Sequence, residues 1–142
     1  MDIIEVEAYS EETRLALQHL LWQLNPQASV LTGAALSRII AADATHLLLA
    51  VKRGRICGTA TIVIMEVLAG KRARIEDVVV AEAMRRQGIG RKLVARAVQL
   101  AREKGAFSIE LTSHPSRQSA NALYLGLGFR LRETNTYTYD LT

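Results

Sequence analysis

The first third of the chain carries a strand pattern followed by two helix patterns. Residues 3–9 open with β-favouring side chains in alternation, Ile4 and Val6 against Glu5 and Glu7, which predicts a β-strand. Ser10 suits the N-cap of a following helix, because Glu11 and Glu12 then lie in the first turn, where the helix dipole favours acids. The apolar stripe of that helix recurs at helical spacing in Leu17, Leu20, Leu21 and Leu24. The inner face of a second short helix, beginning near Thr32, is predicted to contain Leu36, Ile39 and Ile40.

The middle of the chain predicts three strands joined by tight turns. An apolar run covers residues 47–51, Arg53-Gly54 is a turn signal, and residues 56–67 resume with β-favouring side chains in alternation. After a further glycine turn, residues 74–80 form another strand that ends in three consecutive valines. The first two strands are therefore predicted to form a hairpin, and the third extends the same sheet.

The last third returns to helix and strand patterns. Residues 88–104 have a helical period, with alanine, leucine and valine inward and arginine and lysine outward. A strand over 107–111, a short helix over 119–127 and an alternating terminal strand with Tyr137 and Tyr139 complete the series. The predicted order is β-α-α-β-β-β-α-β-α-β, which indicates an α/β fold around one mixed sheet, in a single domain spanning residues 1–142.

Composition is typical of a single globular domain. The 142 residues are 49% hydrophobic, enough for a buried core, and no apolar run approaches the ~20 residues of a membrane-spanning helix. The N-terminal sequence lacks the basic and apolar regions of a secretory signal, and Cys57 has no second cysteine for a disulfide or a two-cysteine metal site. We therefore expect a cytoplasmic protein that binds neither a metal nor a membrane.

The net charge of +4 is unevenly distributed along the chain. Residues 71–104 contain ten basic and four acidic side chains, whereas residues 1–43 contain two basic and six acidic ones. A basic segment beside an acidic one suggests an anionic ligand at the first and a cationic ligand near the second. Two solvated faces are an equally good interpretation of the charge asymmetry alone.

A short basic loop separates the three valines from the long helix, with the sequence Arg85-Arg86-Gln87-Gly88-Ile89-Gly90. We call these six residues the cradle loop. Gly88 and Gly90 have no Cβ, so the backbone can approach a ligand closely. The first amides of the following helix have no partner within it, and Arg91 adds a third arginine. These features predict a phosphate or diphosphate site, although a helix start with surface arginines is the alternative.

The spacing of the cradle loop distinguishes among phosphate-binding families. A dinucleotide fingerprint needs a third glycine where Leu93 stands, and the Gly-Lys-Ser/Thr of a nucleotide-hydrolysing loop is absent. Arg85-x-x-Gly88-x-Gly90 after a strand resembles the cofactor motif of the Gcn5-related N-acetyltransferases (GNAT family), which bind acetyl-CoA. A second segment, from Arg117 through Tyr124 to Gly128-Phe129, is similar to the C-terminal helix motif of that family.

The resemblance covers nearly the whole chain and implies a fold, an activity and a site. The implied fold is of the acyl-CoA N-acyltransferase type, a mostly antiparallel sheet with helices on both faces and two central parallel strands that splay apart. The implied activity is transfer of an acetyl group from acetyl-CoA to a primary amine of a small molecule or peptide, by direct attack in a ternary complex. The implied cofactor-binding residues are Val78, Val79, Val80, Arg85, Arg86, Gln87, Gly88, Ile89, Gly90, Arg91 and Asn121.

Tyr124 is the candidate acid. The resemblance places it near the cofactor sulfur, where a phenol that is protonated at neutral pH can donate to the leaving thiolate. A core tyrosine packed against Phe129 is the other interpretation. For Asn121, one turn earlier, a helix-surface amide is an alternative to a cofactor contact.

The candidate base is less directly specified. The family's best-known catalytic glutamate corresponds to Arg74 in this chain, so Glu76, acting directly or through water, is the candidate, with Glu110 as an alternative. By the two-residue period of a strand, Glu76 should share a face with Val78 and Val80.

Four other residues have chemically useful side chains. His46 and His114 have no recognisable partners, so both are expected to be solvated rather than catalytic. Cys57 lies within a predicted strand and is expected to be a small core residue rather than a nucleophile. Trp22 could line the acceptor pocket or contribute to the core or a dimer contact.

Other function classes fit parts of the sequence. A non-catalytic acyl-CoA-binding or sensing module would need the cradle loop without the acid and base. Nucleic-acid binding is disfavoured, because aromatic residues are only 5% and no stacking pair accompanies the basic segment. The acidic first third favours a cationic acceptor without identifying it. The family often pairs through its terminal strands, so a homodimer is a further expectation.

Overall fold

The computed structural model describes residues 1–142, in five strands, four α-helices and one short 3-10 helix. The strands are β1 (Asp2–Glu5), β2 (Thr45–Lys52), β3 (Arg55–Val67), β4 (Gly70–Val80) and β5 (Ile109–Glu110). The helices are α1 (Glu11–Leu24), α2 (Gly33–Ala41), η1 (Glu82–Met84), α3 (Ile89–Glu103) and α4 (Gln118–Gly126). The chain divides into two compact units, residues 1–112 and residues 113–142. None of its helices has the length and apolar character that crossing a membrane requires.

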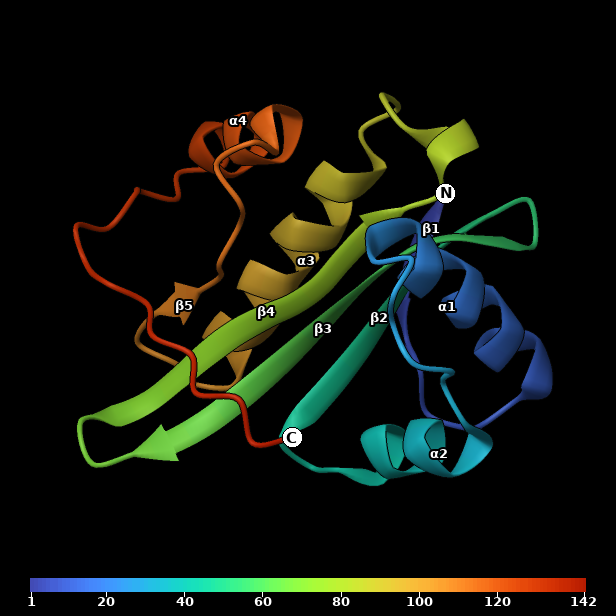
Figure 1. The fold of residues 1–142 in the computed structure, drawn as a ribbon, viewed down its shortest axis with the longest axis horizontal. Coiled ribbons are helices and arrows are strands. Elements are labelled where there is room, and N and C mark those ends of the chain that lie inside the picture. Colours follow the sequence, from blue (N-terminus) through green and yellow to red (C-terminus); the bar gives the residue numbers. More distant parts are fainter. The chain divides into compact units, whose positions relative to one another are not determined.

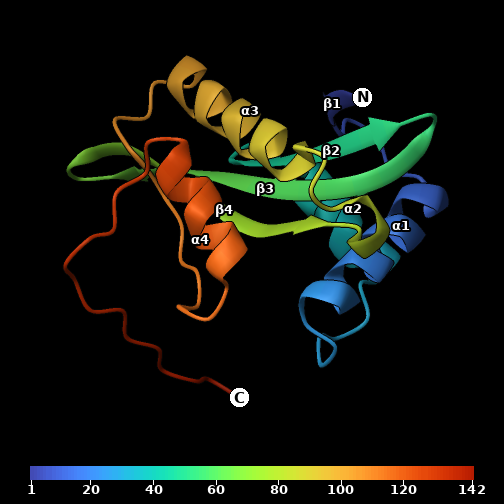
Figure 2. The same ribbon diagram turned by 90° about the horizontal axis from the view of Figure 1, so that it is seen from above.

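The strands form one sheet in the order β1-β2-β3-β4-β5 (Figure 1). Strands β1 to β4 pair with one another in antiparallel fashion, and β5 is parallel to β4. Helix α3 covers one face of the sheet, and α1 and α2 cover the other (Figure 2). The predicted α/β fold, with a mixed, mostly antiparallel sheet and helices on both faces, is therefore confirmed.

Alternation along the strands produces two hydrophobic layers. On the side of α1 and α2, four buried leucines form a cluster: Leu17, Leu36, Leu47 and Leu49. On the other side, side chains of Ile89 and Leu93 from α3 lie against Gly58 of β3. Burial of one such aliphatic side chain contributes about 1.5–3 kcal/mol, so the two layers together hold the helices to the sheet.

Side-chain caps confirm the predicted starts of the first two helices. The Thr13 amide donates to Ser10 Oγ at 3.1 Å, and the Ala35 amide donates to Thr32 Oγ1 at 3.1 Å. Each bond satisfies an amide that the helix itself leaves unpaired. Because a cap depends only on residues three positions apart, the sequence was sufficient to place both helix starts.

A β-bulge in β4 changes which of its residues share a face. Thr59 of β3 pairs with Val79, and Thr61 pairs with Glu76. Between these two pairs β4 therefore has two residues, 77 and 78, where β3 has one. Within this irregularity Asp77 has a φ of +53°, in the left-handed region. The extra residue reverses the alternation, so Glu76 shares a face with Val79. The prediction that Glu76 faces the same side as Val78 and Val80 is therefore wrong.

The predicted terminal strand is also wrong. Residues 129–142 form neither helix nor strand, and Tyr137 and Tyr139 are 86% and 88% exposed. Alternation determines which side chains would share a face, but a strand also needs a neighbouring edge for its backbone groups. The strand predicted over 107–111 is shortened to the two residues of β5.

Candidate functional site

Strand β4 has an unpaired edge over its second half. β5 pairs with β4 at two positions, Ala73 with Ile109 and Arg74 with Glu110. β4 continues from Ile75 to its end without a strand on that side, so the two parallel strands are paired only over these two positions. Apart from the Val80 carbonyl oxygen, which accepts a hydrogen bond from Arg85 Nε, the outward N–H and C=O groups of this segment are available to an extended ligand, which could pair with them as an added strand does.

The cradle loop follows η1 and leads into the first turn of α3. Gly88 caps this helix with a φ of +79°, and Arg86 also has a positive φ, of +66°. A Cβ placed on Gly88 would meet nothing within 4 Å, so the backbone here borders open space. Ile89 is only 3% exposed and fixes the helix start, so its backbone alone can contact a ligand. The exposed residues of the cradle loop are Arg85, Arg86, Gln87 and Gly88, and Arg91, which follows the loop, is exposed as well.

Three hydrogen bonds fix the cradle loop and its approach. Lys52 Nζ donates to Gln87 Oε1 at 2.8 Å, and Arg85 Nε donates to the Val80 carbonyl oxygen at 3.2 Å. The first amide of η1 donates to Gln23 Oε1 of α1 at 2.9 Å. Lys52 and Gln23 could not be identified from the sequence, because no local pattern indicates contacts between residues so far apart along the chain.

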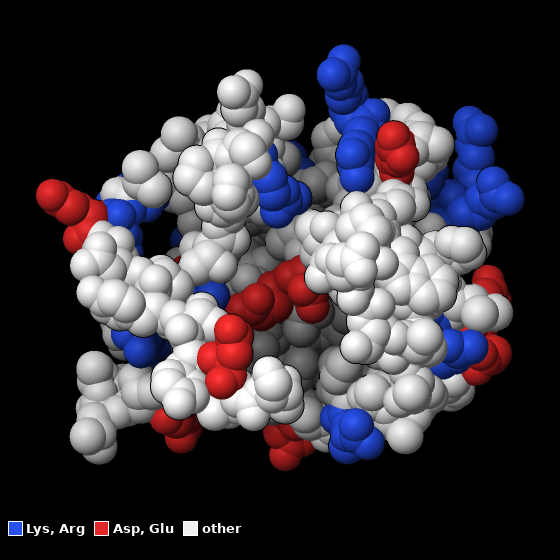
Figure 3. Space-filling view, viewed as in Figure 1, with Lys and Arg blue, Asp and Glu red and all other residues white.

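The two carboxylates of β4 have different surroundings. Glu76 Oε1 accepts a hydrogen bond from Arg74 Nε at 2.9 Å, within an ion pair. Asp77 is exposed as a residue, yet desolvation of its carboxyl, together with the neighbouring charge of Glu76, raises the pKa of Asp77 above its usual range. Acidic side chains are visible near the centre of the face shown in Figure 3. The sequence analysis assigned no role to Asp77.

Tyr124 belongs to residues 113–142 and has 7% of its surface exposed. Its ring centroid lies 6.0 Å from that of Phe129, at an angle of 58° between the ring planes. Burial raises the pKa of Tyr124 above 10.0, against a smaller lowering effect of Arg117. The phenol is therefore fully protonated at neutral pH. Asn121 Nδ2 donates to the His114 carbonyl oxygen at 3.1 Å, so this amide also has a local structural role.

The remaining candidates have mostly structural surroundings. His46 is 8% exposed, with Nδ1 2.7 Å from Glu5 Oε2, so the prediction of a solvated histidine without a partner is wrong. A partner on a strand far away in sequence could not be identified before the sheet was known. His114 is exposed as predicted, and the Cys57 thiol is buried as predicted, with its pKa raised by burial. Trp22 is 40% exposed, and its Nε1 donates to the Ala28 carbonyl oxygen at 3.1 Å.

No group of three or more histidine, cysteine, aspartate or glutamate side chains is arranged to hold a metal ion. Residues 1–112 contribute the cradle loop, the unpaired backbone edge of β4 and the two adjacent carboxylates. Residues 113–142 contribute a protonated, buried phenol. These are groups suited to binding a phosphorylated ligand and to transferring protons.

Solved structures resemble the whole chain. A candidate acetyltransferase from Agrobacterium tumefaciens str. C58 is 26% identical, with a TM-score of 0.88 over 99% of this chain and 100% of the other. A transcriptional regulator from Bacillus halodurans C-125 is also 26% identical, with a TM-score of 0.85 over 98% of this chain and 100% of the other. An aminoglycoside N-acetyltransferase in complex with CoA shares the fold at 19% identity, with a TM-score of 0.80 over 99% and 95% of the two chains.

A search of curated proteins finds no match. The profile described as "Acetyltransferase (GNAT) family" matches residues 8–129, which is most of the chain. The matched region includes the cradle loop and the complete helix α4. The chain therefore belongs to the acetyltransferase (GNAT) family.

Proposed function

We propose that the protein is an N-acetyltransferase that moves the acetyl group of acetyl-CoA to a primary amine of a small molecule or peptide. The observation that carries this proposal is the unpaired edge of β4, which is followed by η1 and then by the cradle loop. Coenzyme A has an extended pantetheine arm that bears amides and is joined to a diphosphate. The arm matches the edge of β4, and the diphosphate matches the cradle loop. A cytoplasmic location and a homodimer belong to the same proposal.

The residues present fit coenzyme A at both ends of the site. The diphosphate would lie at the N-terminus of α3, where unpaired amides and the helix dipole favour anions, with Arg85, Arg86 and Arg91 adding charge. The open space at Gly88 leaves room for the close approach that this requires. The backbone of Val78 and Val80 would pair with the amides of the pantetheine arm.

Proton transfers would be divided between two groups. Acetyl-CoA supplies the activated thioester. Glu76, which forms an ion pair with Arg74, would accept the proton of the acceptor ammonium, directly or through one water. The freed lone pair would form the C–N bond, the C–S bond would break, and Tyr124 would give its proton to the leaving sulfur. The second amine proton would then return the phenol to its starting state. An amide at the end of β4 would donate to the thioester oxygen as its charge develops.

Calorimetric titration with CoA at moderate salt tests the cofactor site. We expect saturable binding to the wild type, and at least tenfold weaker binding to the Arg85→Ala/Arg86→Ala double variant, because each charge-assisted hydrogen bond to a phosphate is stronger than a neutral one. Free thiol should be released from acetyl-CoA when an amine substrate is added. The absence of CoA binding to the wild type would overturn the proposal.

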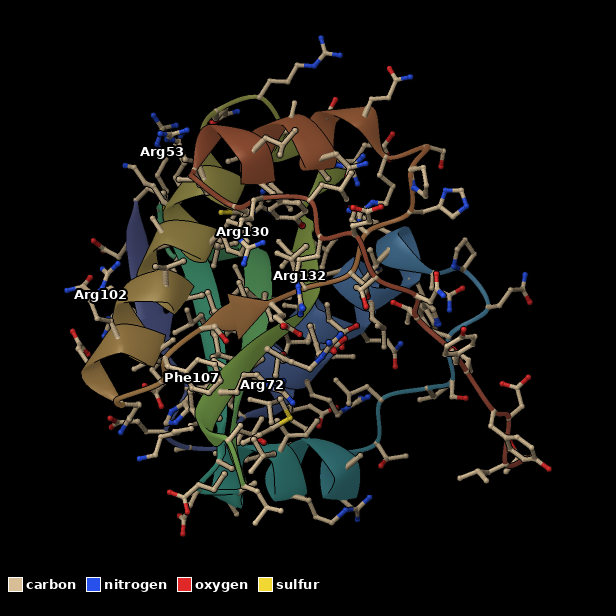
Figure 4. All side chains as sticks on the ribbon, turned by 90° about the vertical axis from the view of Figure 1, so that its left-hand side faces the viewer. Arg53, Arg72, Arg102, Phe107, Arg130 and Arg132 are labelled. Carbon is tan, nitrogen blue, oxygen red and sulfur yellow. The ribbon has the colours of Figure 1, made fainter.

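Arg102→Ala provides the matched control. Arg102 also lies on α3 but in its last turn, and Figure 4 shows it on the outer side of that helix. Arg102→Ala lowers the net charge by one, as each arginine substitution in the double variant does, but it leaves the cradle loop unchanged. CoA affinity should change less than threefold. Equal losses in both variants would mean that general positive charge, and not the cradle loop, holds the ligand.

A non-catalytic acyl-CoA sensor is the second candidate function. The similarity to a protein described as a transcriptional regulator favours it, since that chain is 26% identical and matches along its whole length. This function would retain the cradle loop but would not require proton transfer by Tyr124 or Glu76. CoA binding without thiol release across a broad amine panel would support the sensor over the enzyme.

A further inference from the structure

The turn between β3 and β4 exposes aliphatic side chains at the opposite end of β4 from the cradle loop (Figure 1). Leu68 is completely exposed, and Val67 is 40% exposed. Together with Glu66, Ala69 and Arg72, they line an open hollow of about 770 Å³, which we call the turn hollow. Contiguous exposed apolar surface marks an interaction site more often than scattered apolar residues do.

Arg72 is the only basic residue of β4 without an acidic partner. Lys71 Nζ lies 3.6 Å from Glu66 Oε1, and Arg74 Nε lies 2.9 Å from Glu76 Oε1. Arg72 belongs to no ion pair, and its Nε is buried without a hydrogen-bond acceptor. Because Glu66 is already paired with Lys71, the turn hollow contains an uncompensated positive charge. An anionic group bound to the guanidinium would supply both the missing acceptor and the missing charge.

The strand that bears Arg72 is fixed before any partner binds. Met65 lies opposite Arg72 in the register of β3 and β4, at the distance at which side chains of neighbouring strands pack. On the other side of β4, the Phe107 amide donates to the Lys71 carbonyl oxygen at 2.9 Å. The Phe107 ring lies 3.3 Å from the position that a Cβ on Gly70 would occupy, and Figure 4 shows Arg72 and Phe107 at the same end of β4. A preformed site loses less conformational entropy when its ligand binds.

The groups of the turn hollow match a carboxylate next to apolar side chains. A guanidinium presents its N–H donors in a planar fork that fits the two oxygens of a carboxylate. Val67 and Leu68 offer apolar contacts to the rest of the ligand. Sites for small molecules enclose most of the ligand surface, whereas this hollow is open beside a turn. A segment of polypeptide, whose neighbouring residues remain outside the hollow, fits such a shape better than a small molecule does.

We infer that the turn hollow binds a segment of a partner protein in which an acidic residue stands between aliphatic ones. The carboxylate of the segment pairs with Arg72, and its aliphatic side chains pack on Val67 and Leu68. This inference goes beyond the proposed function and does not depend on it. At about 3.3 Å per residue, the length of β4 separates the turn hollow from the end of the strand that precedes η1 by ~30 Å.

A nuclear magnetic resonance titration of the full chain, labelled with ¹⁵N, tests the inference. The probe is the peptide acetyl-Leu-Asp-Leu-Leu-amide, and the matched peptide has asparagine in place of aspartate. The acidic peptide should cause saturable shifts in the amides of residues 65–73, with a Kd of about 1 mM or below. The asparagine peptide should bind at least tenfold more weakly, because it lacks the charge-assisted bonds.

Arg72→Gln should weaken binding of the acidic peptide at least tenfold and change binding of the asparagine peptide less than twofold, since only the first has a charge to lose. Arg102→Gln, on α3, should leave both within twofold of the wild type. Equal affinities of the two peptides for the wild type, or shifts outside the turn hollow, would overturn the inference without reference to any variant. If octanoate caused shifts that depend on Arg72 and the acidic peptide caused none, the ligand would be a small acid, and the assignment to a protein partner would be wrong.

Leu68→Ser tests the apolar part of the site. It should weaken binding of both peptides at least threefold, whereas Val30→Ser, at an exposed valine elsewhere, should have no effect. Unchanged binding to Leu68→Ser would remove the apolar wall from the site and contradict the assigned ligand class. CoA affinity should remain that of the wild type in Arg72→Gln and Leu68→Ser. A joint loss of CoA and peptide binding would show that the turn hollow is not a separate site.

Discussion

Replacing Tyr124 with phenylalanine is expected to lower the rate of thiol release from acetyl-CoA by about 100-fold or more. General acid catalysis typically contributes 10²–10⁴-fold, and the substitution removes the only proton that the side chain can give. The ring would still pack against Phe129, so the fold should be retained. The measurement is the initial rate at saturating acetyl-CoA and amine, alongside CoA affinity, which should be unchanged.

Tyr137→Phe is the matched control, since Tyr137 is 86% exposed in the segment without regular structure. It should keep the wild-type rate. If Tyr124→Phe remained within threefold of the wild type, Tyr124 would have no part in the chemistry. A rate lost together with CoA binding would instead indicate a structural contribution of the hydroxyl group.

Gly58→Val is expected to destabilise the protein by about 3 kcal/mol, at the upper end of the usual cost of overpacking a core. A Cβ at Gly58 would lie 3.0 Å from Leu93 Cδ1, 3.2 Å from the Val79 carbonyl oxygen and 3.3 Å from Ile89 Cγ2. The new side chain must therefore push α3 away from the sheet. Since Ile89 belongs to the cradle loop and is the first residue of α3, CoA affinity should fall as well. Thermal or urea unfolding and calorimetry would measure the two effects.

Ala95→Val makes a similar addition on the exposed side of α3. It should cost only about 0.5 kcal/mol, from the lower helix propensity of valine. Equal unfolding midpoints for the two variants would show that α3 can move without penalty. If Gly58→Val lowered stability but kept its CoA affinity, ligand binding by the cradle loop would not depend on the position of α3 against the sheet.

The parts of the fold that could be predicted are those fixed by neighbouring residues. Ser10 and Thr32 cap their helices through bonds to amides three residues later, and the leucine spacing in α1 specifies one buried face. The cradle loop could be identified for the same reason, because its glycines and arginines are contiguous with the helix that they begin. In these segments the interactions that stabilise the structure are between residues close together in sequence, so the sequence pattern is sufficient to predict it.

The parts that could not be predicted depend on partners distant in sequence. The bulge at Asp77 is defined by the register between β4 and β3, which the sequence of β4 alone does not contain. An unbroken two-residue period therefore placed Glu76 on the same face as Val78 and Val80, which is wrong. The pair of His46 with Glu5 joins two strands that alternation alone does not place together. The alternating tyrosines of the last segment predicted a strand, but residues 129–142 form none.

The half-paired β4 also bears on how the protein behaves before it meets its ligand. An exposed strand edge is a template on which other polypeptides can assemble, and it is a common origin of aggregation. A pantetheine arm bound along that edge would occupy the same backbone groups. Coenzyme A would then act as a chaperone for its own enzyme, and preparations depleted of it should be the first to self-associate.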